Sequence, residues 1–348
     1  MYGLEKESAA LFLQIDDLLS RYEINDIYSI FPKVPKESLD LLCTLANGSL
    51  KDKEEDYQTP LEIGDYIGNI ENRAFYFSGR VTFCIKCEDR KLMRSIDAVL
   101  RDIKCDKISG KPVNVDIFER DEKVVVAFNG TEVAAPVAKE SALLVLLENM
   151  IILHYQAEPY LIAIHAGAVG VKNESILFPG SSGAGKSTLT AALASEGFSL
   201  YSDEISLVGY DGKLSPLPFC LNIKEGSWNL LAKNYDLLSK ESFIRFDGQK
   251  VKLVPPKNLA RKRAAISAII FPEFERGSKL SLERISSCET LKRIKEGGYQ
   301  LDRPLSEESF EKIVTFILGV PAYILKYGSL SDGVGRVRQL IESGTLDG

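Results

Sequence analysis

Residues 180–188 read Gly-Ser-Ser-Gly-Ala-Gly-Lys-Ser-Thr, a stretch that fits the pattern G-x-x-x-x-G-K-[ST]. In such a loop the backbone N–H groups point at a chain of phosphates, Lys186 reaches the β- and γ-phosphates, and the Ser187 hydroxyl ligates Mg²⁺. Apolar residues 175–178 predict a strand before the loop, and 189–196 predict a helix after it, whose positive N-terminal end favours phosphate. The sequence therefore predicts a site for a nucleoside triphosphate and Mg²⁺. The residues expected to contact the nucleotide are Gly180, Ser181, Ser182, Gly183, Ala184, Gly185, Lys186, Ser187 and Thr188.

The chain just before the loop predicts a β-hairpin. Residues 161–171 are strand-like, and only the polar link 172–174 separates them from the strand at 175–178. In the common P-loop folds the strand before the loop belongs to a parallel sheet and follows a crossover helix. A link this short instead suits two antiparallel strands. The sequence therefore predicts a P-loop strand with an antiparallel strand immediately before it.

Two further features accompany the loop. His165 lies in the preceding strand, 21 residues before Lys186, and Asp203 and Glu204 follow Lys186 by 17 and 18 residues. The apolar stretch 198–208 around the acidic pair predicts a single strand, on which neighbouring side chains point to opposite faces unless a bulge intervenes. We therefore expect one carboxylate to face a metal ion or an acceptor while the other is held elsewhere.

The stretch from His165 to Val208 resembles the core of the bacterial HPr serine kinases and the HPr-kinase-related kinases. In that family a strand with His-Gly or His-Ala-Gly precedes the P-loop, and an Asp-Asp or Asp-Glu pair follows its helix. A looser similarity covers about residues 140–340. Glu204 stands where true HPr kinases have Asp, and the segment they use for phosphorolysis has no clear counterpart. The chain therefore resembles a related kinase more than an enzyme that acts on HPr itself.

The resemblance implies an α/β fold. Residues 141–348 are expected to form a phosphoenolpyruvate-carboxykinase-like P-loop kinase core, with a mixed sheet and an antiparallel strand before the P-loop. Residues 1–140 are expected to form an α+β domain of their own, which carries no recognisable catalytic motif. Its role is either structural cover or recognition of the phosphate acceptor. The helices expected in it are 8–22, 39–46 and 92–103, and the strands are 74–77, 81–87, 113–118 and 124–128.

The resemblance also implies ATP- and Mg²⁺-dependent transfer of the γ-phosphoryl group to a hydroxyl, a reaction that needs charge neutralisation, a metal and a base. Lys186 would neutralise charge, and both Asp203 and Glu204 are candidates for the base. His165 is expected to orient a carboxylate or to contact the γ-phosphate. The candidate metal ligands are Ser187, Asp203 and Glu225. The candidates for stabilising charge in the transition state are Lys224, Arg261 and Arg263.

Three functions fit these residues. The first is a kinase for serine in a protein or peptide, the second a kinase for a small hydroxylated molecule on the same fold, and the third a nucleotide-gated regulator without catalysis. The third is disfavoured because His165, Asp203 and Glu204 are all present. A carboxykinase reaction is disfavoured too, because it needs a metal-binding His outside the P-loop and the chain has 2 histidines. We expect His154, the other one, to be structural.

Composition favours a soluble, cytoplasmic enzyme. The net charge of −6 and a pI near 5.3 argue against a general nucleic-acid binder. The most apolar helix candidate, 142–153, contains Glu148 and Asn149 and is too short to span a bilayer, so we expect no membrane partner. The N-terminus shows no secretory signal pattern. The pair Cys84 and Cys87 lacks further metal ligands at suitable spacing and is expected to be buried in the core. A homo-oligomer is compatible with the sequence.

Overall fold

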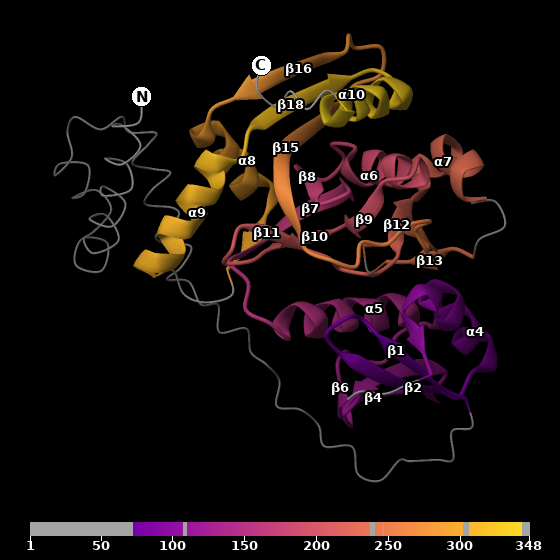
Figure 1. The fold of residues 1–348 in the computed structure, drawn as a ribbon. Helices are drawn as coiled ribbons and strands as arrows, with labels where there is room; N and C mark the ends of the chain where they lie inside the picture. Colours follow the sequence, from indigo (N-terminus) through magenta and orange to yellow (C-terminus); the bar gives the residue numbers. More distant parts are fainter. Residues whose placement is uncertain (1–71, 107–109, 237–240, 246, 302–305, 343–348) are drawn as a thin grey trace, which may run out of the picture.

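The computed structural model describes residues 72–106, 110–236, 241–245, 247–301 and 306–342. The helices expected at 8–22 and 39–46 lie outside the described residues. The described part is an α/β structure with a smaller and a larger β-sheet, and helix α5 (Lys139–Gln156) lies between them (Figure 1). The larger sheet carries the P-loop, so it positions the candidate site.

The smaller sheet contains the strands expected in the N-terminal half. Its strand order is β3-β1-β2-β4-β5-β6, and only β2 and β4 run parallel among these pairs. Helix α4 (Arg90–Val99) begins where the Asp89 side chain accepts hydrogen bonds from two backbone N–H groups. The expected helix 92–103 is thus shorter and is followed by a 3-10 turn, η1 (Arg101–Ile103). The strands are β1 (Arg73–Phe77), β2 (Thr82–Cys87), β3 (Lys104–Cys105), β4 (Val113–Arg120), β5 (Lys123–Phe128) and β6 (Thr131–Glu132).

Helix α5 is part of the same hydrophobic core as the smaller sheet. Leu143, Leu146 and Met150 are fully buried in one cluster with side chains of β2, β4 and β5. That cluster continues into Leu217 and Phe219 from the P-loop half. A division of the chain between residues 140 and 141 therefore cuts through one core, because the helix assigned to the kinase part packs on the N-terminal sheet.

The larger sheet is mixed, and the hairpin expected before the P-loop is confirmed. β7 (Ile162–Val171) pairs antiparallel with β8 (Glu174–Pro179), from Ala166↔Pro179 to Val171↔Glu174. The main strand order is β11-β10-β7-β8-β15-β18-β16, with β9 and β17 also pairing with β7. β8, β15 and β18 are parallel neighbours. The remaining strands are β9 (Ser199–Ser202), β10 (Ile205–Val208), β11 (Lys213–Ser215), β15 (Ala264–Phe274), β16 (Ser281–Ile285), β17 (Tyr299–Gln300) and β18 (Ala322–Tyr327).

Helices cover both faces of this sheet and give it two hydrophobic layers. Residues of α6 (Lys186–Ser195), α7 (Trp228–Tyr235) and α10 (Leu330–Glu342) share a core with one face. Residues of α8 (Ser287–Gly297) and α9 (Glu307–Gly319) share a core with the other. Helix α6 approaches β7 closely, since a Cβ added to Gly167 would lie 2.2 Å from the Thr190 hydroxyl. This close approach seats the P-loop helix directly on the sheet.

The single strand expected at 198–208 is wrong, because it is interrupted at the acidic pair. β9 ends at Ser202 and β10 begins at Ile205. Both pair with β7, and the β7–β9 pairing has a register shift between Ala168 and Val169. The Ala166 N–H donates to the Glu204 carbonyl across the interruption, at 3.1 Å. The bend therefore projects Asp203 and Glu204 out of regular strand alternation.

A small three-stranded sheet completes the surroundings of the site. Its order is β12-β14-β13, all antiparallel. Its strands are β12 (Leu221–Lys224), β13 (Phe243–Ile244) and β14 (Lys250–Val254), and the 3-10 turn η2 (Glu225–Ser227) follows β12. Among the described helices, none has the length and apolar character needed to cross a bilayer.

Candidate active site

The P-loop leaves the C-terminal end of β8 and leads into α6. Gly183 and Gly185 have φ of 88° and 96°, a conformation that favours glycine. Gly185 also lies against β18, because an added Cβ would be 2.7 Å from the Tyr327 hydroxyl. The loop therefore needs glycine at Gly185 for both its backbone angle and its close packing.

Lys186 is buried and held against the loop. Its Nζ donates hydrogen bonds to the carbonyl oxygens of Gly180 at 2.6 Å and Ser181 at 2.9 Å. Burial lowers the pKa of Lys186, and the nearby charge of Lys224 lowers it further, whereas Asp203 and Glu204 act in the opposite direction. The ammonium thus lies at the loop, where a phosphate would compete with the two carbonyl oxygens for its protons.

A cavity of about 480 Å³ opens in front of the loop. It brings together His165, Glu204 and the P-loop with the segment that follows β12. The Thr188 and Ser227 hydroxyls hydrogen-bond at 2.6 Å, which ties α6 to η2 at the rim. The predicted site residues that line this cavity are His165, Ser182, Gly183, Gly185, Lys186, Ser187, Thr188, Glu204, Lys224 and Glu225.

Asp203 is the most perturbed acid near the loop. Its Oδ2 accepts a hydrogen bond from the Asn222 backbone N–H at 2.8 Å, but its buried Oδ1 has no partner among the described residues. The pKa of Asp203 is raised to about 7, mainly by burial and also by the charge of Glu204, while Asn222 and the nearby Ser187 hydroxyl oppose the rise. An unpartnered carboxylate oxygen beside a hydroxyl matches the oxygen ligands that Mg²⁺ prefers. Asp203 and Ser187 therefore fit a shared magnesium site.

Glu204 has a different environment. Its Oε1 accepts a hydrogen bond from Arg245 at 2.9 Å and one from the Asn222 side chain at 3.2 Å, and its side chain is 41% exposed. Asn222 thus holds both carboxylates, one through its backbone and one through its amide. Asn222 and Arg245 were not predicted from the sequence, because a polar residue in β12 and an arginine after β13 show no spacing relation to the P-loop.

His165 lies beside the acidic pair on β7. In the sheet, His165 pairs with Ile205 of β10, and the His165 backbone N–H donates to the Gly298 carbonyl at 2.9 Å. Loss of hydration in the pocket lowers the pKa of His165, and the charge of Lys186 lowers it further, although Glu204 opposes this. A neutral imidazole facing the P-loop cavity is therefore favoured near pH 7.

Arg263 and Arg261 lie away from the site, and their positions contradict the role expected of them. Arg263 precedes β15, whose Ala265 pairs with Glu174 at the start of β8, whereas the P-loop follows the end of that strand. The two ends of β8 are roughly 17 Å apart at the usual rise per residue. Arg263 forms an ion pair with Asp211 at 2.6 Å. Arg261 instead donates to the Asp102 carbonyl of the N-terminal part at 2.8 Å.

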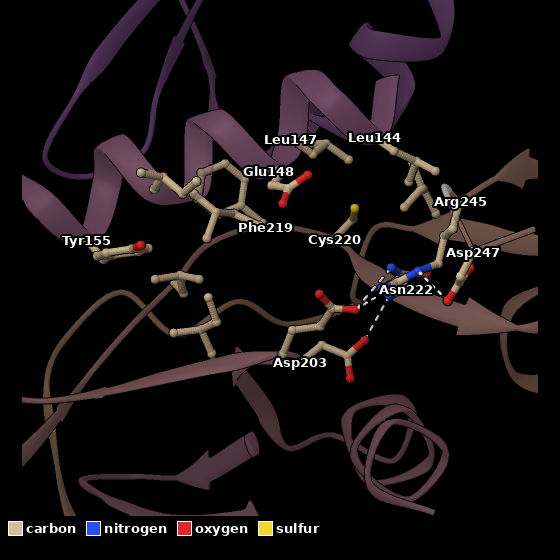
Figure 2. Close-up of a pocket in the computed structure, with 16 residues that line it drawn as sticks. Leu144, Leu147, Glu148, Tyr155, Asp203, Phe219, Cys220, Asn222, Arg245 and Asp247 are labelled. Atoms are coloured by element: carbon tan, nitrogen blue, oxygen red, sulfur yellow. Dashed lines mark hydrogen bonds and ion pairs between the residues drawn. The ribbon is translucent and has the colours of Figure 1, made fainter. Parts of the chain in front are cut away.

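A second cavity, of about 470 Å³, lies on the α5 side of the acidic pair. Figure 2 shows α5 with Leu144 and Glu148 along one wall, and Asp203, Asn222 and Arg245 along the opposite wall. Glu204 lines this cavity as well as the one in front of the P-loop. The carboxylate therefore lies at the junction of two spaces.

The described cysteines add no further chemistry to the site. Cys84 and Cys87 are buried and unbridged, as expected for core thiols. The described residues contain no group of three or more His, Cys, Asp or Glu side chains arranged to hold a metal ion.

No protein-family model matches this chain, and no curated protein matches it either. The residues of the two cavities therefore carry the inference about function.

Proposed function

We propose that the protein is a Mg²⁺-dependent ATP kinase that transfers the γ-phosphoryl group to a hydroxyl. The observation that carries the proposal is the convergence of Lys186, Ser187 and Glu204 on one P-loop cavity, with the buried Asp203 next to Ser187. A P-loop alone would support nucleotide binding. The buried, unpartnered Asp203 oxygen adds a candidate metal ligand, and the ion-paired Glu204 adds a candidate base, which a protein that only binds a nucleotide does not need.

Each residue has a task in this reaction. The P-loop N–H groups and Lys186 hold the β- and γ-phosphates and stabilise the charge that develops on them. Ser187 and Asp203 would hold Mg²⁺, which supplies charge neutralisation at the phosphates, and Glu225, which lines the same cavity as Ser187, is a further candidate ligand. Lys224 adds positive charge at the same cavity. His165 lies next to Glu204 and orients it or the transferred group.

The transfer step requires a base. The acceptor oxygen attacks the γ-phosphorus, the bond from that phosphorus to the β–γ bridging oxygen breaks, and ADP leaves with the electron pair. The hydroxyl proton passes to a carboxylate. Glu204 is the better placed of the two for this task, because it is partly exposed and faces both cavities, whereas Asp203 is buried against Ser187.

Two acceptor classes remain within the proposal. The resemblance noted in the sequence favours serine in a protein or peptide, within a cytoplasmic kinase. The cavity under α5 favours a small hydroxylated molecule, because it is a lined space next to Glu204 instead of an open surface.

The direct test uses the purified full chain with Mg²⁺ and γ-labelled ATP, and measures release or transfer of the label. We expect Lys186→Ala to remain folded and to lower turnover by about 10²-fold or more, because the lost ammonium stabilises charge in the transition state. Lys213→Ala, which removes an exposed lysine of β11, is the matched control and should behave as the parent. Equal turnover in the parent and Lys186→Ala would refute the proposed function.

A further inference from the structure

The cavity under α5 has an apolar body. Most of its described lining consists of aliphatic and aromatic side chains from α5, from the segment before β12 and from β14. The polar lining lies mainly beside the bend at Asp203 and Glu204, and Glu148 adds one carboxylate from the α5 wall (Figure 2). The apolar lining residues are Leu144, Leu147, Ile151, Ile152, Tyr155, Ile205, Leu217, Phe219 and Leu253.

The polar end of this cavity meets the phosphate site. Glu204 lines both spaces, and the Asp203 side chain lies at the same wall. A hydroxyl placed at this end would be beside the proposed base, with the P-loop cavity on the other side of that carboxylate. The apolar body of the same molecule would then extend along α5, away from the phosphates.

The charges around the cavity select against anions. The described lining contains the carboxylates of Glu148, Asp203, Glu204 and Asp247. Its guanidinium, on Arg245, is already paired with Glu204 at 2.9 Å and with Asp247 at 3.8 Å. A carboxylate or phosphate on the acceptor would therefore meet like charge without a free cation among these lining residues, which is unfavourable. A neutral or cationic acceptor meets no such repulsion.

The size of the cavity indicates a small acceptor. About 470 Å³ lies within the usual range for small-molecule sites. The α5 wall also belongs to a buried core shared with the smaller sheet, so it cannot swing away to admit a folded partner without breaking that core.

We propose that this cavity receives the acceptor, and that the acceptor is a small alcohol with an apolar body and no negative charge. This inference rests on the proposed kinase function. The hydroxyl oxygen of the acceptor bonds to the γ-phosphorus, the hydroxyl proton goes to Glu204, and ADP departs. The products are a phosphate monoester and ADP.

The test uses three probes that share a phenyl body and differ in charge: 3-phenylpropan-1-ol (neutral), phenylalaninol (cationic) and 3-phenyllactate (anionic). Their affinities for the full chain are measured by calorimetry with Mg²⁺ and ADP present. We expect the neutral and cationic probes to bind at least about tenfold more tightly than the anionic one, because of like-charge repulsion. Equal or tighter binding of 3-phenyllactate would overturn the charge argument.

Two variants place the binding in this cavity. Ile151→Phe fills part of the apolar space and should weaken the neutral probe by about tenfold, as one bulky group does in a closed apolar pocket. Glu148→Lys reverses one lining charge and should reduce the difference in affinity between the neutral probe and 3-phenyllactate. The matched controls lie outside the cavity: Leu280→Phe on an exposed loop and Glu140→Lys on the same helix. If the exposed Glu148→Lys leaves the charge preference unchanged, the proposal is overturned even where Ile151→Phe fails to fold.

The kinase proposal and this inference fail in different ways. If the full chain binds neither ATP nor ADP in the presence of Mg²⁺, measured without any probe, the kinase function itself is refuted. Label transfer to a serine peptide that neither Ile151→Phe nor Glu148→Lys affects would leave the kinase standing and overturn the acceptor cavity. Phosphorylation of phenylalaninol or 3-phenylpropan-1-ol that Ile151→Phe suppresses would support both.

Discussion

Asp203 and Glu204 are neighbours in the chain, yet they meet different physical conditions. Asp203 is buried and has a pKa raised to about 7, while Glu204 is partly exposed and ion-paired with Arg245. A metal ion would restore the lost solvation of a buried carboxylate, whereas a proton acceptor must be reachable by the hydroxyl. The sequence supplied the pair and its distance from Lys186, but it could not assign these roles, because burial depends on contacts with β12 and α5.

At this scale we predict that Glu204→Gln and His165→Ala reduce phosphoryl transfer far more than they reduce affinity for Mg²⁺-bound ATP. Loss of a general base lowers the rate by about 10²-fold or more, while the phosphates remain bound by the P-loop. Transfer rates and nucleotide affinities measured on the same preparations separate the two effects. The control is Glu283→Gln on the distant strand β16. Parallel losses of rate and affinity would make both residues structural.

At the scale of elements, features that depend on residues close together in the chain were predicted correctly, whereas features that depend on contacts between distant strands were not. The three-residue link 172–174 correctly indicated the β7–β8 hairpin, because a turn of that length leaves no room for a crossover. The interruption between β9 and β10 escaped prediction, since apolar residues flank the acidic pair on both sides and the break appears only in how the two strands pair with β7. The role expected of Arg263 was wrong because the position of a residue just before β15 in the chain does not show which end of the sheet it occupies.

The end of α5 provides a prediction about pH. His154 is 1% exposed, its Nδ1 lies 2.8 Å from the Ser78 hydroxyl, and its Nε2 lies 3.2 Å from the Pro216 carbonyl. Burial, together with the charge of Arg80, lowers the pKa of His154 to about 4, although the hydrogen bond to the Pro216 carbonyl opposes this. The unfolded chain therefore binds more protons than the folded chain between pH 4 and about 6.5, so this contribution to stability is present above pH 6.5 and is lost as pH falls toward 4.

The measurement is the free energy of unfolding by urea from pH 7 to pH 4. We expect it to fall more steeply with acid in the parent than in His154→Gln, which lacks the titrating ring, with a difference of up to about 3 kcal/mol across this window. Identical pH slopes would show that the ring does not stay neutral in the folded protein.

At the scale of the whole molecule, the two halves of the chain are joined by one hydrophobic core. Val126 of the smaller sheet, Leu146 of α5 and Phe219 of the P-loop half belong to the same buried cluster. Composition and motifs suggested a boundary near residue 140, because catalytic patterns begin only after it. Local patterns cannot show that α5, the helix after this boundary, packs on both the smaller sheet and the P-loop half, because these contacts exist only in the assembled core.

This arrangement predicts the behaviour of a fragment that begins at Glu140. It removes β5, against which α5 packs, and exposes the apolar side of α5 that carries Leu143 and Met150. We expect the fragment to aggregate where the full chain remains in solution, because newly exposed apolar surface associates. Size-exclusion chromatography of both, together with their binding of Mg²⁺ and ADP, decides the matter. A monomeric fragment that binds the nucleotide as the full chain does would show that the P-loop half folds alone.

The two sides of α5 have consequences for how this protein can be altered. Leu143, Leu146 and Met150 are completely buried, so bulkier or polar replacements there would disrupt folding. Leu144 and Ile151 are only partly buried and border the cavity under α5. Under the proposed function, mutational libraries restricted to that second side would change which alcohol is accepted and would leave the scaffold and the proposed phosphate-binding groups unchanged. Divergence toward new acceptors would then appear as sequence variation along one stripe of a single helix.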